Sequence, residues 1–130
     1  MRALKREFKG KADAALNGLK ATDFVEMKAY KSPPPAVVFV MEALLVVLAP
    51  DQPDRGWNVA KKVLGPRLLG TLKAFRPETV TPAQIETLMP YVTHAHFADV
   101  GKSSVAARGV AQYLTALVTF GQDLAAARAE

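Results

Sequence analysis

The stretch GKSS, residues 101–104, has residue types that could hold a phosphate, because a glycine, a lysine and a serine precede a predicted helix. The phosphate-binding loop GxxxxGK[ST] requires another glycine at position 96, where this chain has His96. That loop also follows a strand, and no strand pattern precedes residue 101. We therefore do not predict nucleotide binding at residues 101–104.

Two histidines, His94 and His96, could offer nitrogens to a metal, but the sequence shows no third ligand at a suitable spacing. The chain has no cysteine, so it has neither a thiolate metal site nor a cysteine nucleophile. Ser103 and Ser104 lack a recognisable base with an orienting carboxylate, and no paired carboxylates stand out. We predict no catalytic residue, no metal site and no cofactor, and hence a chain that is not an enzyme.

The composition predicts one compact domain with an acidic partner. The chain has 130 residues, 50% of them hydrophobic, and carries 17 Lys and Arg against 12 Asp and Glu. Nucleic acid, an anionic membrane or an acidic protein would each suit a net charge of +5. The lack of cysteine fits a reducing, intracellular setting, and the basic start does not resemble a signal peptide. The apolar stretch 36–49 carries Glu42 and is too short to span a bilayer.

The positive charge is concentrated between Asp54 and Glu78, where no acidic residue occurs. The basic residues of this block are Arg55, Lys61, Lys62, Arg67, Lys73 and Arg76. For any one of them, an ordinary solvated position is the simpler interpretation. Their clustering predicts attraction to an acidic surface, which salt would weaken.

The stretch KSPPPAVVFVMEALLVVL, residues 31–48, predicts a hard break followed by a buried helix. We expect Pro33 and Pro34 to end one helix and Pro35 to begin the next, with Ser32 as its cap. The apolar residues that follow cover more than one face, so other helices must surround this one. It is predicted to be the central helix of the domain.

Further along the chain, the patterns also favour helices. Thr81, Pro82 and Gln84 form a capping-box signature for a helix that we expect to end at Pro90. The last helix is predicted to start at Ser103 or Ser104 and to run toward the C-terminus. No alternating strand pattern competes, so the predicted fold is all-α.

The two end segments have apolar residues at spacings that suit helix pairing. The C-terminal seam has intervals of four and three residues and consists of Ala106, Val110, Tyr113, Leu117, Phe120, Leu124 and Ala127. The corresponding apolar residues of the N-terminal segment are Leu4, Phe8, Ala12, Ala15 and Leu19. The phase of this helical spacing slips near Thr22 and Asp23. We interpret the ends as two arms of an antiparallel coiled coil that carries a small helical head. Ordinary helices of a bundle are the alternative.

LKATDFVEMKAYKSPPPAVVFVMEALLVVL, residues 19–48, resembles the junction in dynein heavy chains where the first stalk strand meets the microtubule-binding domain. The resemblance continues through Trp57 and KKVL, LKAF, ETLMPYV and SSVAARGVAQYLTALVTF, and covers nearly the whole chain from about Leu16. ETLMPYV, TALVTF and the short loops are most similar to the gamma-type heavy chain of axonemal outer arms.

The resemblance implies a non-enzymatic tip of a motor stalk, located in the axoneme of a cilium or flagellum. Residues 1–31 would be the first stalk strand, 32–102 the helical microtubule-binding head, and 103–130 the last head helix continuing into the second strand. Its affinity for αβ-tubulin would change when the strands slide in response to nucleotide in a distant AAA+ ring. The prolines Pro33 and Pro34 would then act as a hinge between the stalk and the central helix.

The resemblance also implies contact residues. At positions that match the tubulin face of the family, Lys31, Lys73 and Lys102 could contribute positive charge, and the predicted contacts further include Arg67, Arg76 and Arg108. The chain departs from the family at Val38, where a lysine is common, and at Arg108, where an acidic residue is common.

A second partner is implied by the gamma-type likeness, namely a leucine-rich-repeat light chain carried on the stalk tip. Its predicted contacts are Tyr91, His94, His96 and Asp99, on the less basic side. The alternative function is a small basic helical module that binds nucleic acid, which the net charge would permit but no zinc-finger or RRM signature supports. We favour the stalk tip, with neither nucleic acid nor membrane as a partner.

Overall fold

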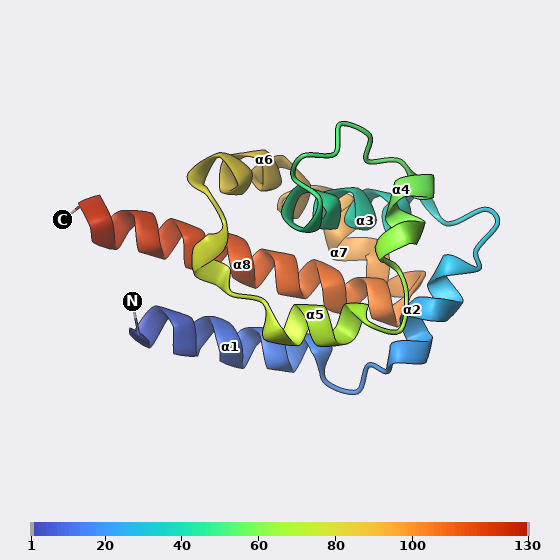
Figure 1. Cartoon of the computed structure of the whole chain (residues 1–130), viewed down its shortest axis with the longest axis horizontal. Coiled ribbons are helices and arrows are strands. Elements are labelled where there is room, and N and C mark those ends of the chain that lie inside the picture. Colours follow the sequence, from blue (N-terminus) through green and yellow to red (C-terminus); the bar gives the residue numbers. More distant parts are fainter. Residues whose placement is uncertain (1, 130) are drawn as a thin grey trace.

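The computed structural model describes residues 2–129, which form eight α-helices and two short 3-10 helices with no strand among them (Figure 1). The elements are α1 (Arg2–Leu16), α2 (Ala21–Lys28), α3 (Pro35–Leu48), α4 (Trp57–Val63), α5 (Leu68–Ala74), η1 (Pro77–Thr79), α6 (Pro82–Val92), α7 (Ala95–Asp99), η2 (Val100–Lys102) and α8 (Val105–Ala129). The predicted all-α fold is confirmed. None of the helices in this part of the chain is both long and apolar enough to cross a membrane.

The helices α1 and α8 lie side by side and antiparallel, so both ends of the chain lie at the same end of the molecule (Figure 1). Phe8, Ala12 and Ala15 of α1 are buried, and the ring of Phe8 contacts the rings of Tyr113 and Phe120 at centroid distances of 5.5 and 5.9 Å. The predicted C-terminal seam is buried from Ala106 to Leu124, whereas Ala127 is exposed. The structure thus confirms that the two end segments pair.

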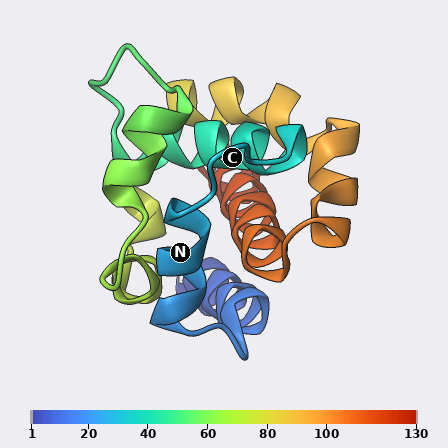
Figure 2. The same cartoon turned by 90° about the vertical axis from the view of Figure 1, so that its right-hand side faces the viewer.

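The core lies between α3 and α8, which contact each other and are covered by the shorter helices (Figure 2). In α3, residues Val37, Val40 and Leu44 are fully buried, as expected for a central helix. The helix α8 is also buried on a second side, which the spacing of the seam residues did not predict. Ala107, Ala111, Leu114 and Val118 lie on that side, because α8 packs on α3 and α6 as well as on α1.

The first arm is two helices rather than one. The sequence predicts a phase slip near Thr22 and Asp23, but the break lies at residues 17–20, between α1 and α2. Gly18 has a φ of 81°, in the left-handed region that glycine adopts without a steric penalty. A glycine in this conformation just after the last helical turn ends the helix and redirects the chain.

Two expectations about the proline segment are wrong and one is confirmed. The helix α2 ends at Lys28, well before Pro33, so the prolines do not end it. Ser32 does not cap α3, because the N-cap residue is Pro34, which has an extended backbone conformation. Pro35 occupies the first helical position, as predicted, where its missing N–H has no helical partner to lose.

The helix α6 begins as predicted but does not end at Pro90. Thr81 and Gln84 form the capping box, with the Gln84 N–H donating to Thr81 Oγ1 at 3.2 Å and the Thr81 N–H to Gln84 Oε1 at 2.8 Å. The helix continues through Pro90 to Val92. Pro90 lacks an N–H of its own, but the Thr93 hydroxyl and N–H both donate to the Met89 carbonyl and hold the last turn.

We expect Tyr113→Phe to lower the free energy of unfolding by about 1–3 kcal/mol. The buried Tyr113 hydroxyl donates to the Leu72 carbonyl at 2.8 Å, and its pKa is raised by burial. Leu72 lies in the last turn of α5, where a carbonyl has no helical partner, so the substitution would leave it unsatisfied. Urea denaturation followed by circular dichroism would measure the change.

The control is Tyr30→Phe. Tyr30 is only half-buried, so the loss of its hydroxyl should change stability little. Equal midpoints for Tyr113→Phe and the parent would mean that the bond between α8 and α5 does not stabilise the fold.

Candidate functional site

The candidate site is the end of the molecule remote from both termini. The segment between α2 and α3, the turn from α4 into α5, and the start of α8 lie at this end (Figures 1 and 2). The short helix η2 contacts both α3 and α8, so it fixes the start of α8 against the central helix. We call this end the tip face.

Four of the predicted contact residues belong to segments of the tip face. Lys31 lies between α2 and α3, Arg67 is the N-cap residue of α5, Lys102 ends η2, and Arg108 lies in the first turn of α8. All four side chains are exposed. Separate parts of the chain therefore bring positive charge to one end.

The side chains of Lys102 and Arg108 lie in different surroundings. Lys102 forms an ion pair with Asp99 at 3.7 Å, but the two side chains are 84% and 58% exposed, so the pair is weak. The stem of Arg108 lies over Gly101, where a Cβ atom would come within 2.7 Å of the Arg108 Cδ atom. The absence of a side chain at Gly101 thus makes room for Arg108.

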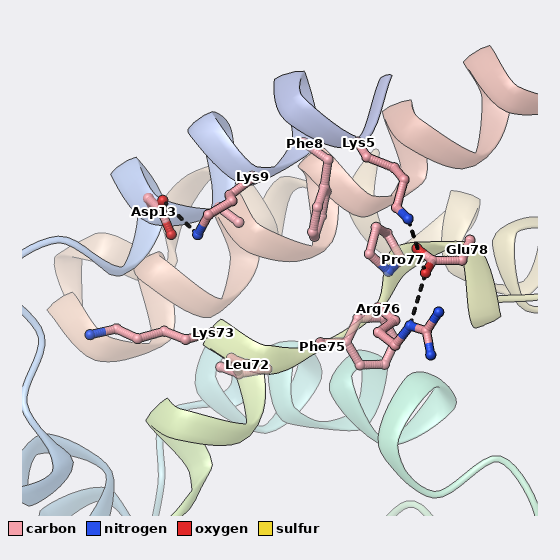
Figure 3. Close-up of a pocket in the computed structure, with 11 residues that line it drawn as sticks. Lys5, Phe8, Lys9, Asp13, Leu72, Lys73, Phe75, Arg76, Pro77 and Glu78 are labelled. Atoms are coloured by element: carbon pink, nitrogen blue, oxygen red, sulfur yellow. Dashed lines mark hydrogen bonds and ion pairs between the residues drawn. The ribbon is translucent and has the colours of Figure 1, made fainter. Parts of the chain in front are cut away.

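The other two predicted contacts, Lys73 and Arg76, lie at the end of α5 and just beyond it, beside α1 (Figure 3). Arg76 Nε pairs with Glu78 at 3.0 Å, and Lys5 of α1 pairs with the same carboxylate at 3.4 Å. This three-residue cluster was not predictable from the sequence, because Lys5 is remote from Glu78 along the chain. The structure does not join these two basic residues to the tip face.

Three of the four residues predicted to contact a light chain surround Phe39 of α3. The ring of Phe39 lies 4.9 Å from Tyr91, 4.6 Å from His94 and 5.3 Å from His96, as centroid distances. Burial raises the pKa of Tyr91, and the nearby Glu42 carboxylate raises it further. The fourth residue, Asp99, instead faces Lys102. Nothing in the apolar pattern distinguished Phe39 as the centre of an aromatic cluster.

Of the histidines and serines that could have done chemistry, one histidine and one serine cap helices. His94 is the N-cap of α7, where its Nδ1 accepts a hydrogen bond from the His96 N–H at 3.0 Å. Ser104 Oγ accepts from the Ala107 N–H at 3.1 Å at the start of α8. Within residues 2–129, no three His, Asp or Glu side chains gather closely enough to hold a metal.

The sequence matches the family described as the microtubule-binding stalk of dynein motor over residues 6–127. It is 35% identical over 118 residues to human dynein axonemal heavy chain 9, covering 84% of this chain and 3% of that protein. It is 30% identical over 125 residues to the Chlamydomonas reinhardtii dynein-1-beta heavy chain of the flagellar inner arm I1 complex, covering 92% of this chain and 3% of that one. This chain therefore spans only a small part of these relatives.

The fold is similar to a solved structure of the microtubule-binding domain of dynein-c. The two share 27% of their residues, the TM-score is 0.76, and the match covers 92% of this chain and 86% of the other. The family match, the relatives and the fold agree with one another and with the paired end helices. The chain belongs to the family of microtubule-binding stalk domains of dynein motors.

Proposed function

We propose that this chain binds the tubulin surface of a microtubule through its tip face. The observation that supports the proposal is the convergence of Lys31, Arg67, Lys102 and Arg108, all exposed, from separate segments onto that end. A cluster of cations attracts an acidic surface at long range and speeds the encounter. Lys73 and Arg76 remain predicted contacts at the side of the head.

The stalk would pass a signal between the tip face and an ATPase ring that lies elsewhere in the motor. We propose that residues 1–31 and 103–130 act as the stalk strands and that residues 32–102 form the head. Small residues such as Ala12, Ala15 and Ala106 make up much of the seam between the strands and specify its alignment loosely. A shift in pairing would then move α3 relative to the strands and change the affinity.

The relatives named above are axonemal or flagellar heavy chains, which supports an axonemal location in a cilium or flagellum for this chain. The gamma-type subtype, and with it a leucine-rich-repeat light chain, remains a prediction. Such a light chain would meet the aromatic cluster of Phe39, Tyr91, His94 and His96, next to Asp99.

Co-sedimentation with stabilised microtubules across a salt series tests the function, with double-stranded DNA as a second acidic polymer. We expect saturable binding to microtubules that weakens as salt rises, and little binding to DNA. Equal binding to microtubules and DNA would mean that the positive charge attracts any acidic polymer. It would then favour the alternative function, a module that binds nucleic acid. The absence of any microtubule binding over the whole salt series would contradict the proposal.

We expect Pro33→Ala together with Pro34→Ala to weaken the coupling between stalk register and microtubule affinity. The prolines lie between α2 and α3, and proline restricts both its own backbone and that of the preceding residue. The measurement compares microtubule affinity for two forms in which introduced disulfides lock α1 and α8 in different registers. The affinity difference should shrink in the double variant.

The control is Ser32→Ala, an exposed neighbour that does not cap α3 and should leave the coupling as it is. An unchanged affinity difference in the proline variant would show that these prolines are not the hinge.

A further inference from the structure

A groove with an apolar floor runs between α1 and the segment from Leu72 to Glu78 (Figure 3). We call it the α1–α5 groove; it lies beside the stalk strand and not among the segments of the tip face. Its volume is about 230 Å³. That is below the roughly 300–1,000 Å³ of typical small-molecule pockets, so the groove suits a side chain of a peptide better than a whole cofactor.

The floor of the groove is fixed in place by the core beneath it. Phe8, Leu72 and Pro77 are buried, and Phe75 is half-buried. The ring of Phe8 packs edge-on against Tyr113 at 5.5 Å, which holds it in position from below. An apolar side chain entering the groove would therefore meet a preformed surface and would not have to order it.

The rim of the groove is basic. It carries Lys5 and Lys9 from α1 and Lys73 and Arg76 from the other wall, against the two carboxylates of Asp13 and Glu78. Both carboxylates are already paired, Asp13 with Lys9 at 3.3 Å and Glu78 with Lys5 at 3.4 Å and Arg76 at 3.0 Å. Four cations against two carboxylates leave an excess of positive charge around an apolar floor.

The ion pairs of the rim can exchange partners. The side chains of Lys9 and Arg76 are 71% and 76% exposed, so their existing pairs are weak and open to an incoming carboxylate. The pKa of Glu78 lies below its ordinary value, chiefly because of its own backbone N–H and further because of Arg76 and Lys5. Glu78 therefore remains a charged partner that holds Lys5 and Arg76 at one end of the groove.

We propose that the α1–α5 groove binds a short acidic peptide segment of a partner protein, with one aromatic or aliphatic side chain on the apolar floor and carboxylates against the basic rim. A second copy of this chain is a poor occupant, because two chains of net charge +5 repel each other. The groove shares Lys73 and Arg76 with the predicted microtubule contacts at the side of the head, but it includes none of the four cations of the tip face on which the microtubule proposal rests.

The test uses the whole chain and a short glutamate-rich peptide with one central phenylalanine, followed by two-dimensional NMR of the protein amides. We expect chemical-shift changes centred on Phe8, Ala12, Leu72 and Phe75. A matched peptide with glycine in place of the phenylalanine should bind about tenfold more weakly, because a buried aromatic anchor supplies much of the affinity in such contacts.

Two protein variants complete the test. Lys9→Glu reverses a charge on the rim, whereas Lys11→Glu makes the same change on an exposed side chain that lines a different hollow of the surface. Peptide binding should weaken with the first variant and not with the second. Shifts centred on the tip face, equal affinity for the glycine peptide, or equal effects of the two variants would each overturn the proposal. Neither variant alters a residue proposed to contact microtubules, so the outcome leaves that proposal to its own test.

Discussion

Replacing Gly109 with alanine should lower the free energy of unfolding by about 1–2 kcal/mol, against the usual preference of helices for alanine. Gly109 is buried in α8, where α1 ends and the chain turns toward α2. A Cβ atom there would lie 2.8 Å from the Ala15 carbonyl oxygen and 2.6 Å from Leu19 Cδ1. The leucine can turn aside, but the carbonyl belongs to the backbone of α1, so the two helices would have to separate.

Gly70→Ala is the matched control for this prediction. Gly70 is also helical, but it is exposed on α5 and a Cβ atom there would meet nothing within 4 Å. The control should therefore stabilise the chain by about 0.4–1 kcal/mol, through the lower entropy of the unfolded chain and the helix preference of alanine. Urea denaturation of both variants would measure opposite signs. If Gly109→Ala also stabilised the chain, the close approach of α1 and α8 would not matter for stability.

The parts of the fold that local chemistry determines were predictable from the sequence. Pro35 begins α3, Thr81 and Gln84 cap α6, and Ser104 caps α8, because each of these residues acts on backbone groups within its own first turn. The seam from Ala106 to Leu124 was predictable because its helical spacing must face one partner.

The errors in the fold arise where distant or flanking residues decide the local structure. Pro90 was expected to end α6, but the helix continues to Val92. Its last turn is held by hydrogen bonds that the Thr93 hydroxyl and N–H donate to the Met89 carbonyl. The first arm was expected to run through residues 17–20, but Gly18 adopts a left-handed conformation that its neighbours could not reveal. The spacing of apolar residues indicates that a helix is present and which of its faces is buried. It does not indicate the residue at which the helix ends, because contacts with other parts of the chain decide that.

The candidate site was predictable only in part, for a related reason. A sequence shows which residues are basic, but the topology decides whether these residues lie on the same surface. Arg67 and Lys73 are close in sequence, yet Arg67 lies at the turn into α5 near the tip face and Lys73 lies on the rim of the α1–α5 groove. The aromatic cluster around Phe39 and the pairing of Lys5 with Glu78 each join residues from different helices, and no local pattern encodes such a pairing.

Arg108→Glu should weaken microtubule binding about tenfold. Arg108 is exposed in the first turn of α8, and its stem lies over Gly101. The substitution replaces an attraction to an acidic tubulin surface with a repulsion at the same position. The substitution therefore tests whether the basic residue of this chain contributes to its affinity.

Arg128→Glu is the matched control, because it makes the same charge change on an exposed residue of the same helix. Arg128 lies in the last turn of α8, and at a rise of about 1.5 Å per residue it is roughly 30 Å from Arg108 along the helix axis. That distance exceeds the screening length of about 8 Å at physiological salt, so the control should bind microtubules nearly as the parent does. Circular dichroism of both variants would confirm that the helices are retained.

The central claim is that the tip face, and not the positive charge of the chain as a whole, binds the microtubule. Its most direct test is the microtubule affinity of the parent, Arg108→Glu and Arg128→Glu, measured side by side by co-sedimentation at one fixed salt concentration. We predict a loss of affinity with Arg108→Glu alone. Equal losses in the two variants, or none in either, would contradict the assignment of tubulin binding to the tip face.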